Sequence, residues 1–227
     1  MNERVGSGPV PAGSGSPSGG RESVEDWLAR RLVDAGPGVP PAGLLRVLRV
    51  LGGWDRRTYE VVAGLSTPLL DEPMRVVSRV ADHSKPWLAT AAVLAVVGGP
   101  TGRRAALAGV AAIGATSFVV NQPMKRAGSR RRPDRRSMRV PVARWIPMPA
   151  STSFPSGHSA SAAAFAVAVG GVIPQLRVPL RVAAATVAFS RVYTGVHYPG
   201  DVIVGAVTGA VVGRTTSRLV MRMTRAR

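Results

Sequence analysis

Five apolar runs, each with at most one charged residue, lie between residues 87 and 213 and limit what the chain can fold into. The runs are residues 87–99, 105–120, 159–173, 180–189 and 201–213. Each is shorter than the roughly 20 residues that a lone spanning helix prefers, but flanking residues extend it and neighbouring helices would shield its polar ends. Arg-bearing segments such as PTGRR at 100–104 are expected to turn the chain between runs. The pattern predicts an all-α, integral membrane helical bundle with about five transmembrane spans; the alternative is a soluble Ala-rich bundle.

The segment before these runs has a different character. Residues 1–41 are rich in Gly, Ser and Pro and predict a disordered, low-complexity tail with a possible short helix at 22–34. Residues 42–86 carry Leu and Val at helical spacing with Arg between them, which is typical of amphipathic helices lying on a membrane surface. The predicted domains are therefore the tail (1–41), an amphipathic interfacial segment (42–86), a membrane domain (87–220) and a basic tail (221–227).

The formal net charge of +18 predicts an anionic partner. Nucleic acid, anionic lipid headgroups and phosphorylated substrates all fit that charge. The basic loop at 126–145 lacks the interleaved aromatic residues on which bases stack, so no nucleic-acid partner is expected. The chain contains no cysteine, which excludes disulfides and thiolate metal sites.

Acids and histidines are scarce in the region of the apolar runs. After residue 83 the only acids are Asp134 and Asp201, and the only histidines are His158 and His197. With five spans, the segment after the second run, the start of the third and the end of the fourth fall on one membrane face. That face then carries Lys125 to Arg132, PSGH at 155–158 and SRVYTGVHYPGD at 190–201. Such clustering is what an active site needs.

Several of these residues are suited to binding an oxyanion. Lys125, Arg132 and Arg191 are cations, and arginine makes bidentate contacts with phosphate. Ser156 and Gly157 open a predicted helix, whose free N–H groups and positive dipole end favour an anion. Taken alone, the basic loop also fits a topology signal or a contact with lipid headgroups.

The remaining residues are suited to acid–base and nucleophilic chemistry. Two histidines, His158 and His197, can serve as nucleophile and general acid. Asp201 follows His197 by four residues and can fix the tautomer of its imidazole. An HxxxD spacing by itself is common, and a lone histidine at a helix start is more often a cap, so the functional interpretation depends on all of these features occurring together.

Three complete motifs stand in order along the chain. Residues 125–133 match KxxxxxxRP, residues 155–158 match PSGH, and residues 190–201 match SRxxxxxHxxxD. On these residues the chain resembles the type 2 phosphatidic acid phosphatase superfamily over about residues 80–215. This superfamily also includes polyprenyl-pyrophosphate phosphatases, glucose-6-phosphatase and vanadium haloperoxidases.

The resemblance implies a role for each matched position. His197 would attack phosphorus and form a phosphohistidine, His158 would protonate the leaving oxygen, and Asp201 would orient His197. The residues that would bind phosphate are Lys125, Arg132, Ser156, Gly157 and Arg191. No metal and no other cofactor is implied, since the cations and the helix end neutralise the transferring group.

The resemblance also implies a substrate class, a lipid phosphate. Size and Ala/Arg-rich style are similar to the actinobacterial branch that acts on decaprenylphosphoryl-5-phosphoribose in cell-wall arabinan synthesis. Phosphatases of undecaprenyl pyrophosphate, phosphatidic acid or phosphatidylglycerolphosphate are alternatives within the class. A vanadate-dependent haloperoxidase and a non-catalytic membrane scaffold with a lipid-phosphate pocket are alternatives outside it.

The distribution of Lys and Arg predicts the orientation in the membrane. The face that carries the motifs holds more of these residues than the opposite face, so the positive-inside rule places the active site on the cytoplasmic side of a multi-pass protein of the plasma membrane. Membrane lipids are the expected partners besides the substrate. The steps between Gly205, Gly209 and Gly213 predict close helix packing, within one chain or between subunits, and leave the oligomeric state open.

Overall fold

The computed structural model describes residues 42–128 and 130–225, and their regular structure is helical. The longer helices are α2 (Ala42–Gly64), α3 (Pro68–Val80), α4 (Lys85–Val97), α5 (Gly99–Val119), α7 (Gly157–Val172), α8 (Arg177–Tyr193) and α9 (Pro199–Arg225). The short elements between them are η1 (Asp82–Ser84), the π-helical η2 (Val120–Met124), α6 (Lys125–Ala127), η3 (Val142–Arg144) and η4 (Pro174–Leu176). This confirms the all-α class for the described residues. The short helix predicted at 22–34 lies outside them.

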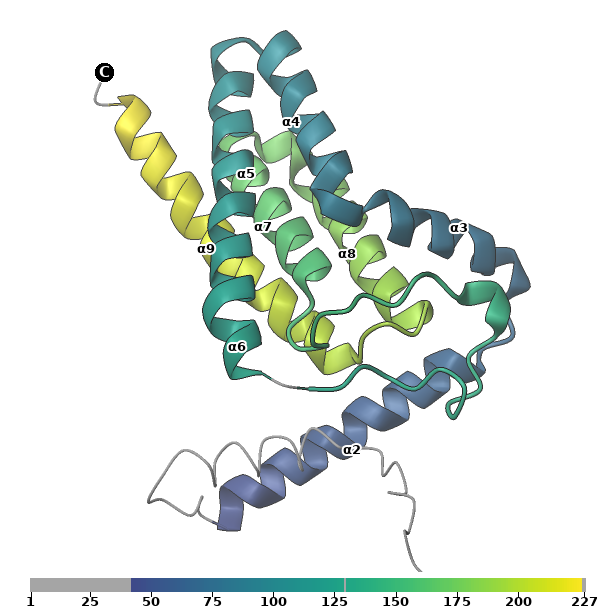
Figure 1. Ribbon diagram of the computed structural model, residues 1–227. Helices are drawn as coiled ribbons and strands as arrows, with labels where there is room; N and C mark the ends of the chain where they lie inside the picture. Colours follow the sequence, from purple (N-terminus) through teal and green to yellow (C-terminus); the bar gives the residue numbers. More distant parts are fainter. Residues whose placement is uncertain (1–41, 129, 226–227) are drawn as a thin grey trace, which may run out of the picture.

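Helix α7 is the centre of the bundle and packs against α5, α8 and α9, while α4 packs on the outside of α5 (Figure 1). Its buried residues are mostly Ala and Ser, with one large side chain, Phe165, which packs against Trp87 of α4 at a ring-centroid distance of 5.6 Å. The small side chains on α7 allow the neighbouring helices to approach it closely.

Glycines on α9 bring that helix into direct contact with the backbone of α7. A Cβ atom added at any of three glycines would overlap a carbonyl oxygen of the neighbouring helix. The facing pairs are Gly205 with Ser156, Gly209 with Ala160, and Gly213 with Ala164. This confirms the predicted close packing and shows that it occurs within one chain. The first pair holds the start of α7 against the second turn of α9, which brings the second and third motifs together.

The outer surface of the bundle is apolar. Large hydrophobic side chains are exposed on α4, α5, α8 and α9; they include Val93, Val96, Leu107, Val110, Phe118, Val178, Val182, Ile203, Val207 and Val211. One helical stretch among the described residues, Gly99–Ala127, is long and apolar enough to cross a membrane, and Gly157–Val172 is a shorter apolar helix. The other bundle helices are shorter or carry more charge, so the count of about five spans remains a prediction.

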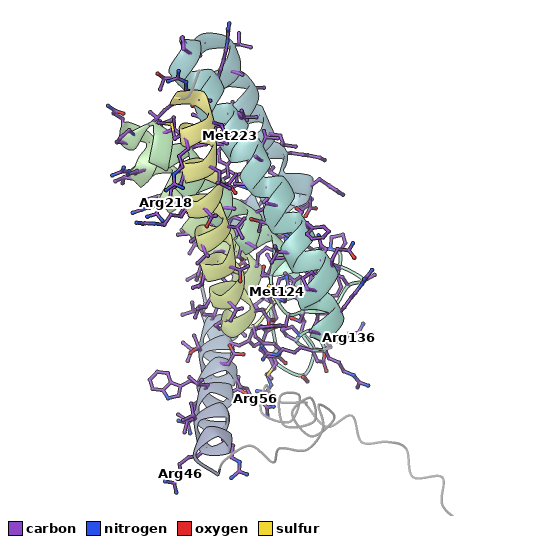
Figure 2. The ribbon with its side chains drawn as sticks, turned by 90° about the vertical axis from the view of Figure 1, so that its left-hand side faces the viewer. Arg46, Arg56, Met124, Arg136, Arg218 and Met223 are labelled. Atoms are coloured by element: carbon purple, nitrogen blue, oxygen red, sulfur yellow. The ribbon has the colours of Figure 1, made fainter. Side chains whose placement is uncertain are left out.

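The amphipathic segment forms two helices outside the bundle. Figure 1 shows α2 beneath the bundle end where α6 lies, with the loop of residues 128–156 between them. Arg144 of that loop is buried and donates hydrogen bonds to the carbonyl oxygen of Val62 at 3.1 Å and to Asp71 at 2.8 Å. In Figure 2, Met223 lies near one end of the molecule, while Met124 and Arg136 lie toward the end that α2 adjoins. The loop is therefore fixed to α2 and α3 at a single end of the bundle.

One predicted turn is wrong. PTGRR at 100–104 was expected to turn the chain, but it forms the first turns of α5. The chain reverses at Gly98 and Gly99, where Gly99 has a positive φ of 57°, which glycine adopts without steric cost. Pro100 stands at the start of α5, a position where its fixed φ and missing N–H suit a helix.

Candidate active site

The PSGH turn is a helix cap built against the start of α9. Ser156 precedes α7, and its hydroxyl group accepts a hydrogen bond from the N–H of Ser159. The N–H of Ser156 donates to the carbonyl oxygen of Asp201 at 2.9 Å. The N–H groups of Gly157 and His158, at the start of α7, have no acceptor within the helix and are directed out of its end. The cap thus offers free N–H donors at a fixed position beside the third motif.

His197 is buried between a carboxylate and a guanidinium. Its Nδ1 atom lies 3.6 Å from Oδ2 of Asp201, and its Nε2 atom lies 3.2 Å from Nη1 of Arg132. A proton on Nδ1 faces the carboxylate, which leaves the lone pair on Nε2. The imidazole is only 2% exposed. This geometry holds one ring nitrogen ready as a nucleophile next to a cation.

Burial lowers the pKa of His197 to about 4, because the protein interior penalises the imidazolium form. Asp201 opposes this shift, while the positive charges of Arg132 and Arg191 add to it. His197 is therefore neutral at physiological pH, the state in which Nε2 can attack an electrophile.

Asp201 is saturated with hydrogen bonds. Its Oδ2 accepts from the hydroxyl of Ser153 and, at 2.9 Å, from the N–H of Tyr198; its Oδ1 accepts from Arg130 at 2.7 Å. The side chain is fully buried. These donors fix the carboxylate in place, so the position that it imposes on His197 is also fixed.

The two cations of the first motif converge on Ser151. Lys125 begins α6 directly after the π-helical η2, and its Nζ donates to the Ser151 hydroxyl at 3.2 Å. Arg132 donates from Nε to the Ser151 carbonyl oxygen at 2.9 Å and from Nη1 to the carbonyl oxygen of Val196 at 2.8 Å. Burial lowers the pKa of Arg132 to about 10, which still leaves it charged at neutral pH. Ser151, which sequence reasoning missed, is thus the contact between the two cations.

Arg191 comes from the last turn of α8 and is also buried. Its Nη1 donates to the hydroxyl of Ser78 at 2.7 Å and to the Ser78 carbonyl oxygen at 3.1 Å. Its Nε has no hydrogen-bond partner among the described residues. The guanidinium lies close enough to His158 and His197 to influence both electrostatically. One side of Arg191 is therefore anchored on α3, while the Nε side keeps hydrogen-bonding capacity for a ligand.

His158 has a carboxylate partner that the motifs do not contain. Its Nε2 atom lies 2.8 Å from Oδ1 of Asp82, in η1 between α3 and α4. Burial and the positive charge of Arg191 disfavour the imidazolium form of His158, and the Asp82 carboxylate opposes them by favouring that form, which a general acid requires. Asp82 is the last acid before the acid-poor region of the sequence, and that position is the one signal by which it could have been found.

A second buried network links the site to α2. Arg130 donates to Asp201 at 2.7 Å and to Asp55 of α2 at 2.6 Å, and its guanidinium carbon lies 3.9 Å from the ring centroid of Tyr198. Asp55 also accepts the N–H of Gly200 at 2.6 Å. Neither Asp55 nor Arg130 was singled out from the sequence, since both stand in Arg-rich stretches without recognisable spacing.

The structure thus brings the predicted site residues to one end of the bundle. Lys125, Gly157 and His158 line a common cavity, while Arg132, Arg191 and Asp201 surround the imidazole of His197. No group of three or more His, Asp or Glu side chains that could hold a metal ion occurs in residues 42–128 and 130–225.

Comparison with known proteins gives the same family as the motifs. Residues 105–225 match the model of the PAP2 superfamily. The chain is 35% identical over 168 residues to a decaprenylphosphoryl-5-phosphoribose phosphatase of Mycobacterium tuberculosis, an alignment that covers 70% of this chain and 88% of the relative. It is 36% identical over 138 residues to the protein of the same name from Mycolicibacterium smegmatis, with 58% and 68% covered.

A solved structure supports the fold. The transmembrane PAP2-type phosphatidylglycerolphosphate phosphatase from Bacillus subtilis superposes with a TM-score of 0.60 and 22% identity, over 78% of this chain and 90% of that one. The chain therefore belongs to the PAP2 superfamily of membrane phosphatases, the family that its three motifs predict.

Proposed function

We propose that the protein hydrolyses the phosphomonoester of a polyprenyl-linked sugar, such as decaprenylphosphoryl-5-phosphoribose, through a phosphohistidine and without a metal ion. The observation that carries this proposal is the neutral, buried His197, with Nδ1 toward Asp201 and Nε2 toward Arg132. A nucleophile, its orienting carboxylate and a cation for the developing negative charge are the parts that phosphoryl transfer to histidine requires.

The first step transfers the phosphoryl group to the enzyme. Nε2 of His197 forms a bond to phosphorus as the bond from phosphorus to the leaving oxygen breaks. His158 gives its proton to that oxygen. The non-bridging oxygens meet Lys125, Arg132 and the N–H groups at the start of α7, which stabilise the charge that spreads over them.

The second step returns the enzyme to its starting state. A water molecule attacks phosphorus, and the bond from Nε2 of His197 to phosphorus breaks. The proton that the water loses goes to His158, which restores the imidazolium for the next cycle. Asp82 supports both steps by holding His158 and stabilising its charged form.

The relatives support the choice of substrate. Two mycobacterial proteins at 35% and 36% identity are named decaprenylphosphoryl-5-phosphoribose phosphatases. The likeness to the B. subtilis enzyme extends to the fold alone, so it gives no argument for a glycerolipid substrate.

Phosphate release by the purified protein tests the proposal. Wild-type protein should release phosphate from decaprenylphosphoryl-5-phosphoribose with a chelator present, and His197→Ala should abolish release. Quenched wild-type reactions should contain an acid-labile, alkali-stable phosphoprotein. Gln175→Ala, a change at an exposed position in η4, serves as the control that retains activity. Activity in His197→Ala would refute the assignment of the nucleophile, and loss of activity on chelation would refute metal independence.

The apolar outer surface of the bundle and the distribution of Lys and Arg support an arrangement in the membrane. We propose that α4, α5, α7, α8 and α9 span the bilayer, that α2 and α3 lie at its surface, and that the site faces the cytoplasm. Because the chain lacks cysteine, a single introduced thiol reports its own accessibility. An impermeant thiol reagent should label Gln175→Cys in intact cells and Val142→Cys, 73% exposed in the site loop, only after permeabilisation. Labelling of Val142→Cys in intact cells would reverse the orientation.

A further inference from the structure

A cavity of about 180 Å³ opens beside the candidate active site on the side of His158. Three of its lining residues, Lys125, Gly157 and His158, belong to the motifs, whereas His197 is not among them. Its other walls come mainly from η1, from the last turns of α5 and from η2, and the residues of these segments that line the cavity have no role in the chemistry described above.

The direction of phosphoryl transfer gives this cavity a role. The attacking and leaving atoms stand on opposite sides of phosphorus, roughly in line. If Nε2 of His197 attacks, the leaving oxygen lies on the far side, where His158 must reach it to donate a proton. The cavity is lined by His158 and not by His197, so it is the space that the leaving group enters.

Several polar side chains that line the cavity have no hydrogen-bond partner among the described residues. Ser84, Ser117, Asn121 and Ser161 line it, and their side chains make no hydrogen bond to another described residue. The hydroxyl of Thr116, which is 1% exposed and also lines the cavity, has no partner among the described residues either. Hydroxyl and amide groups both donate and accept, as do the hydroxyl groups of a sugar. A buried polar atom without a partner is costly, and a ligand hydroxyl would relieve that cost.

Two irregular segments form these walls. His83 and Ser84 have positive φ angles of 55° and 58°, which non-glycine residues seldom adopt. Across the cavity, the π-helical η2 ends at Met124, which is labelled in Figure 2, and both Asn121 of η2 and the following Lys125 line the cavity. Both features are departures from regular helix that recur at functional sites.

We propose that this cavity is the leaving-group subsite and that it binds a single sugar ring through its hydroxyl groups. The assignment rests on the proposed function, since it takes His197 as the nucleophile and His158 as the acid. The cavity volume of about 180 Å³ suits one sugar ring.

Two substrates and two neighbouring variants test this subsite. One substrate is the phosphomonoester of a polyprenyl-linked pentose; the other is a polyprenyl monophosphate, in which no hydroxyl group stands near the leaving oxygen. Asn121→Ala removes an amide that lines the cavity, whereas Gln122→Ala removes an exposed amide from the next residue of η2, which does not line it. Ser117→Ala is a second variant within the cavity.

We expect Asn121→Ala and Ser117→Ala each to lower kcat/KM for the sugar phosphate by roughly three- to tenfold, the effect of one lost hydrogen bond, and to leave kcat/KM for the polyprenyl monophosphate unchanged. Gln122→Ala should change neither. Equal losses with both substrates, or no loss in either cavity variant, would overturn the subsite alone. Wild-type protein that releases phosphate from neither substrate would overturn the proposed function and the subsite with it.

Discussion

Asp55→Asn should lower both the stability of the protein and its activity, although Asp55 lies on α2, outside all three motifs. Asp55, Arg130 and Asp201 form a buried row in which one guanidinium serves two carboxylates, at 2.6 and 2.7 Å. Loss of one partner from a buried ion pair costs about 3–5 kcal/mol. Arg130 keeps Asp201, and the amide oxygen of Asn can still accept the N–H of Gly200, so we expect the lower value of about 3 kcal/mol.

For a chain of this length, about 3 kcal/mol lowers Tm by roughly 6–12 °C. Thermal unfolding of the purified protein in detergent measures the shift, and Glu60→Gln, at an exposed position on the same helix, is the matched control. The kcat for phosphate release should also be lower in Asp55→Asn, because Arg130 helps to hold the Asp201 carboxylate that orients His197. Arg130→Met should cost more than Asp55→Asn, since it uncovers two carboxylates at once. The reasoning is refuted if Asp55→Asn unfolds at the same temperature as Glu60→Gln, or if the order of the two variants is reversed.

Three further changes test other parts of the structure. The lowered pKa of His197, about 4, predicts that the acidic limb of the kcat/KM profile lies near pH 4, and an acidic limb near pH 6.5 would contradict this. The stability of the fold should decline between about pH 6.5 and 4, where the unfolded chain binds a proton that the folded chain does not. Asp82→Asn should lower kcat about tenfold for an alkyl phosphate and much less for an aryl phosphate, because a good leaving group needs little proton donation from His158. An equal loss of kcat with both substrates would mean that Asp82 does not act through His158. Gly209→Ala should destabilise the protein by about 1–3 kcal/mol in thermal unfolding, because the added methyl group overlaps α7. Gly114→Ala is the control, because Gly114 has open space around it and the change should be neutral or stabilising. Equal effects of the two changes would refute the close packing of α7 and α9.

The three motifs predicted the central side chains of the site because they stand at helix ends that a bundle must bring to one side. Ser156 caps the start of α7, Arg191 lies in the last turn of α8 and Asp201 lies in the first turn of α9, so an all-helical arrangement with short connections placed them together. The glycine spacing on α9 likewise predicted close packing, although the partner helix α7 became known only from the structure.

Contacts between distant segments were beyond prediction. Asp82 meets His158 across 76 residues, and Asp55 meets Arg130 across 75, with no spacing that relates either pair. A π-helical turn at residues 120–124 has no sequence signature apart from Pro123, which fits many other local structures. The turn predicted at PTGRR failed for a related reason, since proline both ends helices and begins them.

The uneven distribution of acids in the sequence has a structural counterpart. Of the acids at or before residue 82, Asp55, Asp71 and Asp82 come from α2, α3 and η1 in turn, and each pairs with a cationic or histidine side chain of the later, acid-poor part. The partners are Arg130, Arg144 and His158. The amphipathic segment therefore supplies the carboxylates that the motif-bearing region lacks, and it holds both the long basic loop and the candidate acid His158. The boundary predicted at residue 86 thus separates two segments that these three charged pairs connect. Removal of α2 would leave Arg130 with Asp201 as its one remaining carboxylate among the described residues.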